Sequence, residues 1–129
     1  MANQFAVSTV IQVPAKKIYD AWLNSEGHAR MTGGSARINA EVGAEFEAWD
    51  GYIRGKNLIL EPSQRIVQSW RTTEFSEEEP DSQIEVTFEK AGAGTKVTIH
   101  HTHLPKHGKQ YKQGWVENYF EPMKKYFKS

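Results

Sequence analysis

The residues best suited to chemistry are three histidines close together in the last third of the chain. His100, His101 and His103 end a stretch in which apolar residues alternate with polar ones, with Val97 and Ile99 on one face. Alternate residues of a β-strand point to the same side, so His101 and His103 are expected to face the interior beside those two aliphatic residues. Two imidazoles at that spacing could hold a zinc ion together with a third ligand.

The third zinc ligand would come from His107 or Glu117. However, no carboxylate motif accompanies the histidines, and the chain has no cysteine. The preferred interpretation is therefore that His101 and His103 line the wet end or the rim of a cavity. We expect no metal ion and no cofactor.

General acid–base catalysis is the other chemistry these residues suggest. A histidine or carboxylate inside an apolar pocket can have a shifted pKa, and His101, His103 and Glu47 are the candidates. No Ser-His-Asp order, phosphate-binding glycine loop or dinucleotide fingerprint is present, since Gly92-Ala93-Gly94 is typical of a hairpin turn. We therefore name no catalytic residue, and an enzyme stays a lesser alternative.

The C-terminal segment has the clearest pattern. From Gln110 onward the apolar residues recur at helical spacing and cover about half of the helical wheel. They are Tyr111, Trp115, Val116, Tyr119, Phe120, Met123, Tyr126 and Phe127. So wide an apolar face predicts a helix seated deeply against a concave surface. Pro122 removes one backbone donor and predicts a kink in this helix.

The large side chains either line a ligand pocket or form an ordinary core, and the sequence leaves both interpretations open. The residues concerned are Trp22, Trp70, Trp115, Tyr119 and Met123. Gln68 lies between Ile66 and Trp70 on the same strand face. A buried amide needs a partner, so Gln68 either orients a polar ligand group or, as we slightly prefer, bonds a tyrosine hydroxyl.

The remaining segments predict the sheet that holds the helix. Strands are expected at residues 5–13, 36–40, 44–49, 52–60, 65–73, 83–90 and 95–104, with short helices at 15–23 and 26–31. Asp50-Gly51 indicates a tight hairpin with positive φ, and Gly55 indicates a bulge or a close backbone approach. This order predicts an α+β domain over residues 1–129, with a curved antiparallel sheet wrapped around the C-terminal helix.

Composition narrows the functional classes. Among 129 residues, 16 are Lys or Arg and 16 are Asp or Glu. This balance argues against a nucleic-acid partner, which usually meets a basic surface. No apolar run approaches a membrane span, and the N-terminus does not resemble a signal peptide. We expect a cytoplasmic monomer.

Four stretches resemble homologues of the activator of heat-shock-protein-90 ATPase, within the START-like or helix-grip superfamily, also called SRPBCC. They are Ile11–Trp22, Val42–Gly55, Leu60–Arg71 and Gln113-Gly114-Trp115. The resemblance implies a helix-grip fold that holds an apolar ligand between helix and sheet. It also implies two alternatives: an interaction with a chaperone of the heat-shock-protein-90 type, and a cavity enzyme of the cyclase or hydrolase type.

The leading hypothesis is a module that binds an apolar or amphipathic small molecule, such as a lipid, in a hydrophobic cavity. The expected contacts are Trp70, His101, His103, Trp115, Tyr119 and Met123. The motivating pattern is a wide aromatic helix face opposed by strands that carry polar side chains.

Overall fold

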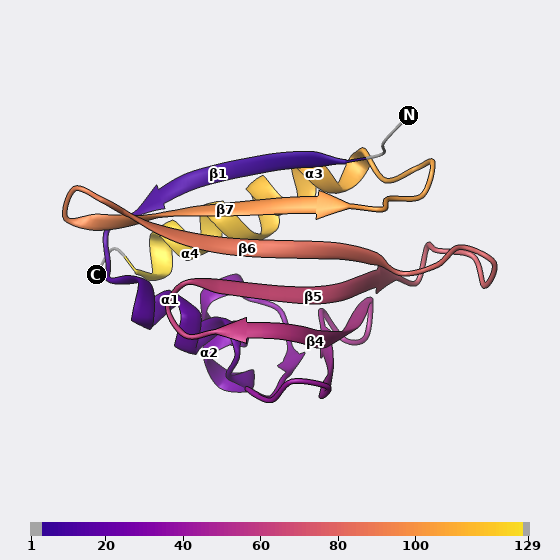
Figure 1. Cartoon of the computed structure of the whole chain (residues 1–129), viewed down its shortest axis with the longest axis horizontal. Helices are drawn as coiled ribbons and strands as arrows, with labels where there is room; N and C mark the ends of the chain where they lie inside the picture. Colours follow the sequence, from indigo (N-terminus) through magenta and orange to yellow (C-terminus); the bar gives the residue numbers. More distant parts are fainter. Residues whose placement is uncertain (1–3, 128–129) are drawn as a thin grey trace.

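The order of helices and strands follows the sequence pattern closely. The computed structural model describes residues 4–127 (Figure 1). Its elements are β1 (Phe5–Ile11), α1 (Ala15–Trp22), α2 (Ser25–Thr32), β2 (Ala36–Arg37), β3 (Glu45–Ala48), β4 (Ile53–Glu61), β5 (Arg65–Thr72), β6 (Ser82–Ala91), β7 (Gly94–Thr102), α3 (Gln110–Trp115), the π-helical turn η1 (Val116–Phe120) and α4 (Glu121–Tyr126). In the described residues, no helix is long and apolar enough to cross a membrane.

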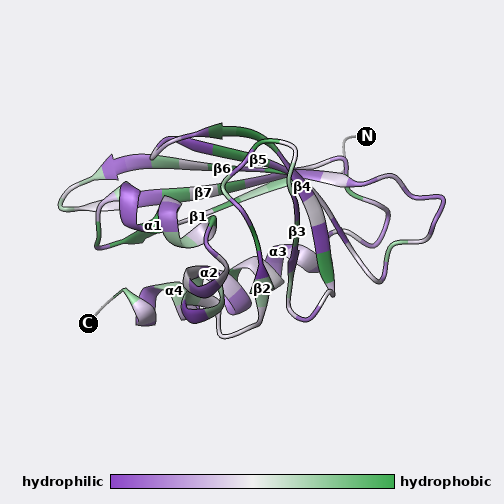
Figure 2. Cartoon of the chain, turned by 90° about the horizontal axis from the view of Figure 1, so that it is seen from below, coloured by the Kyte–Doolittle hydropathy of each residue, from purple (hydrophilic) through white to green (hydrophobic). Residues whose placement is uncertain are grey.

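The strands form one antiparallel sheet in the order β1-β7-β6-β5-β4-β3-β2. The N-terminal strand β1 pairs with β7, so the first and the last strand of the sheet lie side by side at one edge. All helices lie on one side of the sheet (Figure 2), and α3, η1 and α4 run along it as one continuous segment. The predicted α+β arrangement, a curved sheet around a C-terminal helix with two short helices after the first strand, is confirmed.

The two short helices cover the core beside the last helix. Ile18 and Trp22 are buried on α1. Asn24 caps α2, because its side chain accepts a hydrogen bond of 2.8 Å from the Gly27 amide. Gly33, at φ 86°, ends α2 in the left-handed conformation.

The last helix changes its geometry just before Pro122. Across η1 the backbone is π-helical, and the Glu121 amide donates to the carbonyl of Val116, five residues earlier. Proline has no amide hydrogen, so a regular α-helical bond to Asn118 is missing at this point. The kink expected at Pro122 stays a prediction, and the departure from regular α geometry beside this proline is the π turn.

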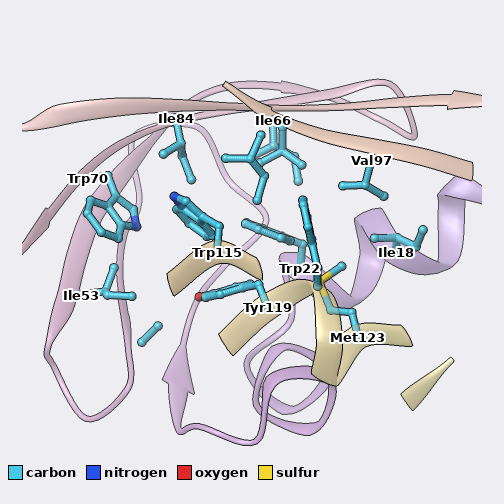
Figure 3. Packing of buried hydrophobic residues seen from close by; sticks show 14 of the residues in the cluster. Ile18, Trp22, Ile53, Ile66, Trp70, Ile84, Val97, Trp115, Tyr119 and Met123 are labelled. Carbon is cyan, nitrogen blue, oxygen red and sulfur yellow. The ribbon is translucent and has the colours of Figure 1, made fainter. Parts of the chain in front are cut away.

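The core lies between the sheet and the helices. Figure 3 shows Ile66, Ile84 and Val97 of the sheet above Trp22 and Met123 of the helices. All of these side chains are at most 1% exposed. Burial of a large aliphatic side chain contributes about 1.5–3 kcal/mol, so this layer is the main source of stability.

Two glycine positions shape the β3–β4 hairpin. Trp49, Asp50 and Gly51 have φ of 55°, 58° and 84°, which confirms the positive φ predicted for Asp50-Gly51. At Gly55 a Cβ atom would lie 1.8 Å from the Ser69 carbonyl oxygen, so the close approach predicted there is also confirmed. The register shift of β4 falls between Asn57 and Ile59, not at Gly55.

We predict that Gly55→Ala lowers the free energy of unfolding by about 3 kcal/mol, because the added methyl group collides with backbone that cannot move aside. Urea denaturation measures this change. Gly114→Ala is the matched control, since its Cβ would meet only Asn118 Nδ2, at 3.8 Å. The control should leave stability unchanged or raise it by up to about 1 kcal/mol. Equal stability of Gly55→Ala and wild type would contradict the close approach.

Candidate functional site

A buried histidine of α2 is hydrogen-bonded to a tyrosine of the last helix. His28 is 2% exposed, and its Nδ1 lies 2.9 Å from the Trp22 carbonyl oxygen. A carbonyl can only accept, so Nδ1 carries the proton and donates it. His28 Nε2 then has a free lone pair, which accepts a 2.8 Å hydrogen bond from the Tyr119 hydroxyl. The neutral ring is the form that fits both partners.

A second buried histidine, on β7, holds the same helix one turn earlier. The Trp115 indole Nε1–H donates to His101 Nδ1 at 3.0 Å. An indole only donates, so the His101 proton lies on Nε2, which donates to Ser82 Oγ at 2.8 Å. Ser82 Oγ in turn donates to the Trp70 carbonyl oxygen at 2.7 Å. Both ring nitrogens of His101 are therefore engaged within the protein.

Burial keeps both imidazoles neutral. Removal from water lowers the pKa of His28 to about 4, although its bond to the Trp22 carbonyl opposes this effect. Burial alone lowers the pKa of His101 to about 3. A charged ring in either place would also lose the hydrogen bond that it accepts from the last helix.

The buried amide of Gln68 belongs to a separate chain of hydrogen bonds beneath the helix. Its Oε1 accepts from Trp22 Nε1 at 3.3 Å, and its Nε2 donates to Asn57 Oδ1 at 2.9 Å. Asn57 Nδ2 in turn donates hydrogen bonds to the carbonyl oxygens of Asn39 and Glu41. The preferred expectation of a tyrosine partner for Gln68 is thus wrong, because an indole and an amide satisfy the side chain.

A cavity of about 470 Å³ opens between the last helix and the β3–β4 hairpin. We call it the aromatic cavity. It is lined by Trp49, Tyr52, Ile53, Trp70, Gln110, Tyr111, Gly114, Trp115, Asn118 and Tyr119. Figure 3 shows Ile53 and Trp70 on the sheet side, opposite Trp115 and Tyr119 on the helix.

Two parallel rows of helix residues form one wall of the aromatic cavity. The inner row is Tyr111, Trp115 and Tyr119, and all three are buried. The outer row is Gln110, Gly114 and Asn118, which are partly or fully exposed. Both rows have the four-residue spacing that places side chains one above another on a helix. The wall is therefore apolar inside and polar at the mouth.

Glu74 bridges the two sides of the mouth. Its Oε2 accepts a short hydrogen bond from the Tyr52 hydroxyl on the hairpin side. The same oxygen accepts from Gln110 Nε2 of the helix at 3.1 Å. These bonds hold the pKa of Glu74 below its usual range, the Tyr52 bond having the larger effect. Burial, followed by the bond to Glu74, raises the pKa of Tyr52.

A second polar group stands deeper in the cavity. The Tyr111 hydroxyl lies 2.6 Å from Thr72 Oγ1 and 3.1 Å from His107 Nε2. Burial raises the pKa of Tyr111, so its hydroxyl stays protonated at neutral pH. The cavity therefore presents hydroxyl and amide groups for hydrogen bonding at defined points along apolar walls.

Three of the six predicted contact residues line the aromatic cavity: Trp70, Trp115 and Tyr119. Met123 is buried in the core and does not line it. His101 lies behind the wall, with its ring centroid 4.6 Å from that of Trp70. The two histidines named as contacts thus do not reach the cavity, and the roles of the three lining residues stay predictions.

His101 and His103 were expected to face the interior from the same side of one strand, and this prediction is wrong. β7 ends at Thr102, and His103 is exposed with φ 56°, so it no longer follows the alternation of the strand. Among residues 4–127, no three side chains of His, Cys, Asp or Glu gather as a metal site requires. Glu47, the other acid–base candidate, lies in a different, charged hollow beside Arg37 and Arg54.

Seven lining residues were not predicted, and they come from two places. Trp49, Tyr52 and Ile53 surround the Asp50-Gly51 turn, and Tyr111 and the outer row lie on the helix. The four-residue spacing from Gln110 to Asn118 was visible in the sequence. The position of the hairpin beside the helix was not, because it depends on contacts between segments far apart in the sequence.

The sequence matches a known family. The family model described as activator of Hsp90 ATPase homolog 1-like protein matches residues 12–128. The chain belongs to this family. A curated member, an activator of 90 kDa heat shock protein ATPase homolog from Dictyostelium discoideum, is 31% identical over 111 residues, which are 84% of this chain and 29% of that protein.

Other members of the activator of Hsp90 ATPase family are also much longer than this chain. The human activator of 90 kDa heat shock protein ATPase homolog 1 is 26% identical over 113 residues, which are 87% of this chain and 33% of that protein. The chain thus spans about a third of the length of the curated relatives that it matches.

Solved structures agree on the fold. An HSP90 activator from Plasmodium falciparum has a TM-score of 0.82 at 23% identity, over 92% of this chain and 91% of that one. CalU16 from Micromonospora echinospora has a TM-score of 0.80 at 21% identity, over 98% of this chain and 76% of that one. At these identities the likeness shows the helix-grip fold alone.

We predict that the two buried histidines make the protein sensitive to mild acid. Their pKa values are depressed in the folded state, so the unfolded chain takes up protons first as the pH falls below about 6.5. Stability is therefore full above pH 6.5 and declines toward the folded-state pKa values of about 4 for His28 and about 3 for His101. The free energy of unfolding should fall by about 3 kcal/mol between pH 6.5 and 5.

Urea denaturation at a series of pH values measures this slope. His28→Gln should remove about half of the slope, whatever its effect on absolute stability, because one of the two depressed pKa values is gone. His103→Gln is the matched control, since His103 is exposed, and it should keep the full slope. A free energy of unfolding that is equal at pH 6.5 and 5 would show that the buried rings are not neutral.

Proposed function

We propose that this chain binds an apolar or amphipathic small molecule in the aromatic cavity. The observation that carries the proposal is the cavity itself, with apolar rings inside and amide and hydroxyl groups at its mouth. Its volume of about 470 Å³ falls within the range of about 300–1,000 Å³ common for small-molecule sites.

The physical character of the walls supports binding. Burial of about 200 Å² of apolar ligand surface contributes about 5 kcal/mol, before the cost of immobilising the ligand. The inner row is held rigidly, since Trp115 and Tyr119 each donate a hydrogen bond to a buried histidine. A wall that is already ordered loses little entropy when a ligand binds.

Gly114→Leu tests this proposal by filling the cavity from the helix side. Residue 114 lines the cavity, and an added Cβ would meet only Asn118 Nδ2, at 3.8 Å, so the larger side chain has room without disturbing the backbone. Amide NMR titration with fatty acids, sterols and flavonoids should give saturable shifts around Trp70 and Trp115 in the wild type. Gly114→Leu should weaken the binding of any ligand found by at least about tenfold.

Lys112→Leu is the matched control for the filled cavity. Lys112 is an exposed residue of the same helix and does not line the cavity. The same new side chain at this position should leave the titration unchanged. Absence of saturable shifts in the wild type for fatty acids, sterols, flavonoids and naphthyl compounds of either charge alike would remove the proposal, and so would equal binding by Gly114→Leu and wild type.

A second candidate function is modulation of a chaperone of the heat-shock-protein-90 type. Family membership favours it, because the curated relatives are named as activators of this ATPase. In this role the exposed surface acts, and the cationic residues Lys124 and Lys125 on α4 are exposed. The expectation that the chain is a monomer stays a prediction in either role.

A chaperone ATPase assay tests the second candidate function. For chaperone modulation, Lys124→Glu with Lys125→Glu should reduce any stimulation several-fold, since reversal of two exposed charges disturbs the electrostatic complementarity of an interface that includes α4. Gly114→Leu should leave the stimulation intact. A loss caused by Gly114→Leu alone would contradict an interaction through α4, and no stimulation by the wild type would remove this second candidate.

A further inference from the structure

We infer that the ligand of the aromatic cavity is an organic cation: a compact apolar body that carries an amine or a quaternary ammonium group. This inference rests on the proposed function, because it specifies the ligand of the same cavity. It follows from the charges around the cavity and from the kind of side chain that makes its walls.

The walls of the aromatic cavity contain no ionised side chain. Its ten lining residues are three tryptophans, three tyrosines, one isoleucine, one glycine and two amides. A ligand carboxylate would find no lysine, arginine or histidine among them to pair with. Lys112 on α3 is exposed and lies outside the lining, as does Lys109 just before the helix.

Glu74, an acid, is bonded to this lining, and so is His107, whose Nε2 lies 3.1 Å from the Tyr111 hydroxyl. Glu74 accepts hydrogen bonds from Tyr52 and from Gln110, two lining residues on opposite sides of the mouth. Both bonds involve Oε2, and both stabilise the carboxylate form, which lowers the pKa of Glu74. A negative charge is therefore fixed at the entrance, where it attracts a cation and repels an anion.

Aromatic rings suit the body and the charge of such a ligand. Trp49, Trp70 and Trp115 supply indoles, and indole is the side chain that binds cations best through its π-face. The two histidines that hold the wall add no opposing charge, because His28 and His101 are neutral. The buried indoles of Trp70 and Trp115, with the exposed Glu74 carboxylate at the mouth, suit an alkylammonium group.

The test uses three compounds with one apolar body: naphthylmethyl-trimethylammonium, naphthylmethanol and naphthoate. Isothermal titration or amide NMR gives the three dissociation constants at low salt. The ammonium compound should bind at least about fivefold more tightly than the alcohol, and the carboxylate should bind more weakly than the alcohol.

Glu74→Gln tests how much the negative charge of the carboxylate contributes to the preference for a cation. The amide oxygen can still accept hydrogen bonds from Tyr52 and Gln110, so the mouth keeps its shape while it loses its charge. Affinity for the alcohol should be unchanged, and the preference for the ammonium compound over the carboxylate should fall at least about threefold. Glu89→Gln, an exposed site near the far end of β6, is the matched control and should preserve the preference.

The outcomes distinguish the two claims. No binding of any of the three compounds to the wild type, together with no binding in the fatty acid, sterol and flavonoid panel, contradicts the proposed function and this inference with it. Binding of the alcohol or the carboxylate as tightly as the ammonium compound leaves the cavity as a binding site and overturns the choice of a cation. A preference that Glu74→Gln leaves unchanged also overturns it.

Discussion

Two neutral imidazoles determine where the last helix lies. His28 and His101 each donate one hydrogen bond to the body of the domain and accept one from the helix, from Tyr119 and Trp115 respectively. A buried imidazole can do both only without a charge, so these bonds depend on the exclusion of water from the core. They fix two rings one helical turn apart, and those rings form the inner wall of the aromatic cavity.

The opposite wall depends on backbone geometry in the sheet. The close backbone approach at Gly55 and the positive φ of Asp50 and Gly51 define the hairpin, whose residues Trp49 and Tyr52 line the cavity together with the inner row. Glu74 then joins the two walls at the mouth. Space remains because the helix presents Gly114 where any larger side chain would extend into the cavity. The aromatic cavity is therefore an opening between two walls that are ordered for separate reasons.

Local patterns in the sequence were enough to predict the elements and the wide face of the last helix. Alternation and helical spacing act over a few residues, and so do the signals of Asp50-Gly51 and Gly55. The hydrogen-bond partners of buried polar groups could not be predicted from local patterns, since Gln68 bonds Trp22 and Asn57, which lie on other elements. His103 was misplaced because β7 ends one residue before it. The role of His28 was missed because nothing near it in the sequence indicates Tyr119, which lies 91 positions later.

The most direct test of this account is the protonation and tautomer state of the two histidines, from long-range ¹H–¹⁵N NMR spectra at pH 5.5. The account predicts two neutral rings, His28 with its proton on Nδ1 and His101 with its proton on Nε2, because each lone pair accepts a hydrogen bond from the last helix. A charged ring at this pH, or the opposite tautomer in either histidine, would contradict the claim that neutral imidazoles position the helix and its cavity wall.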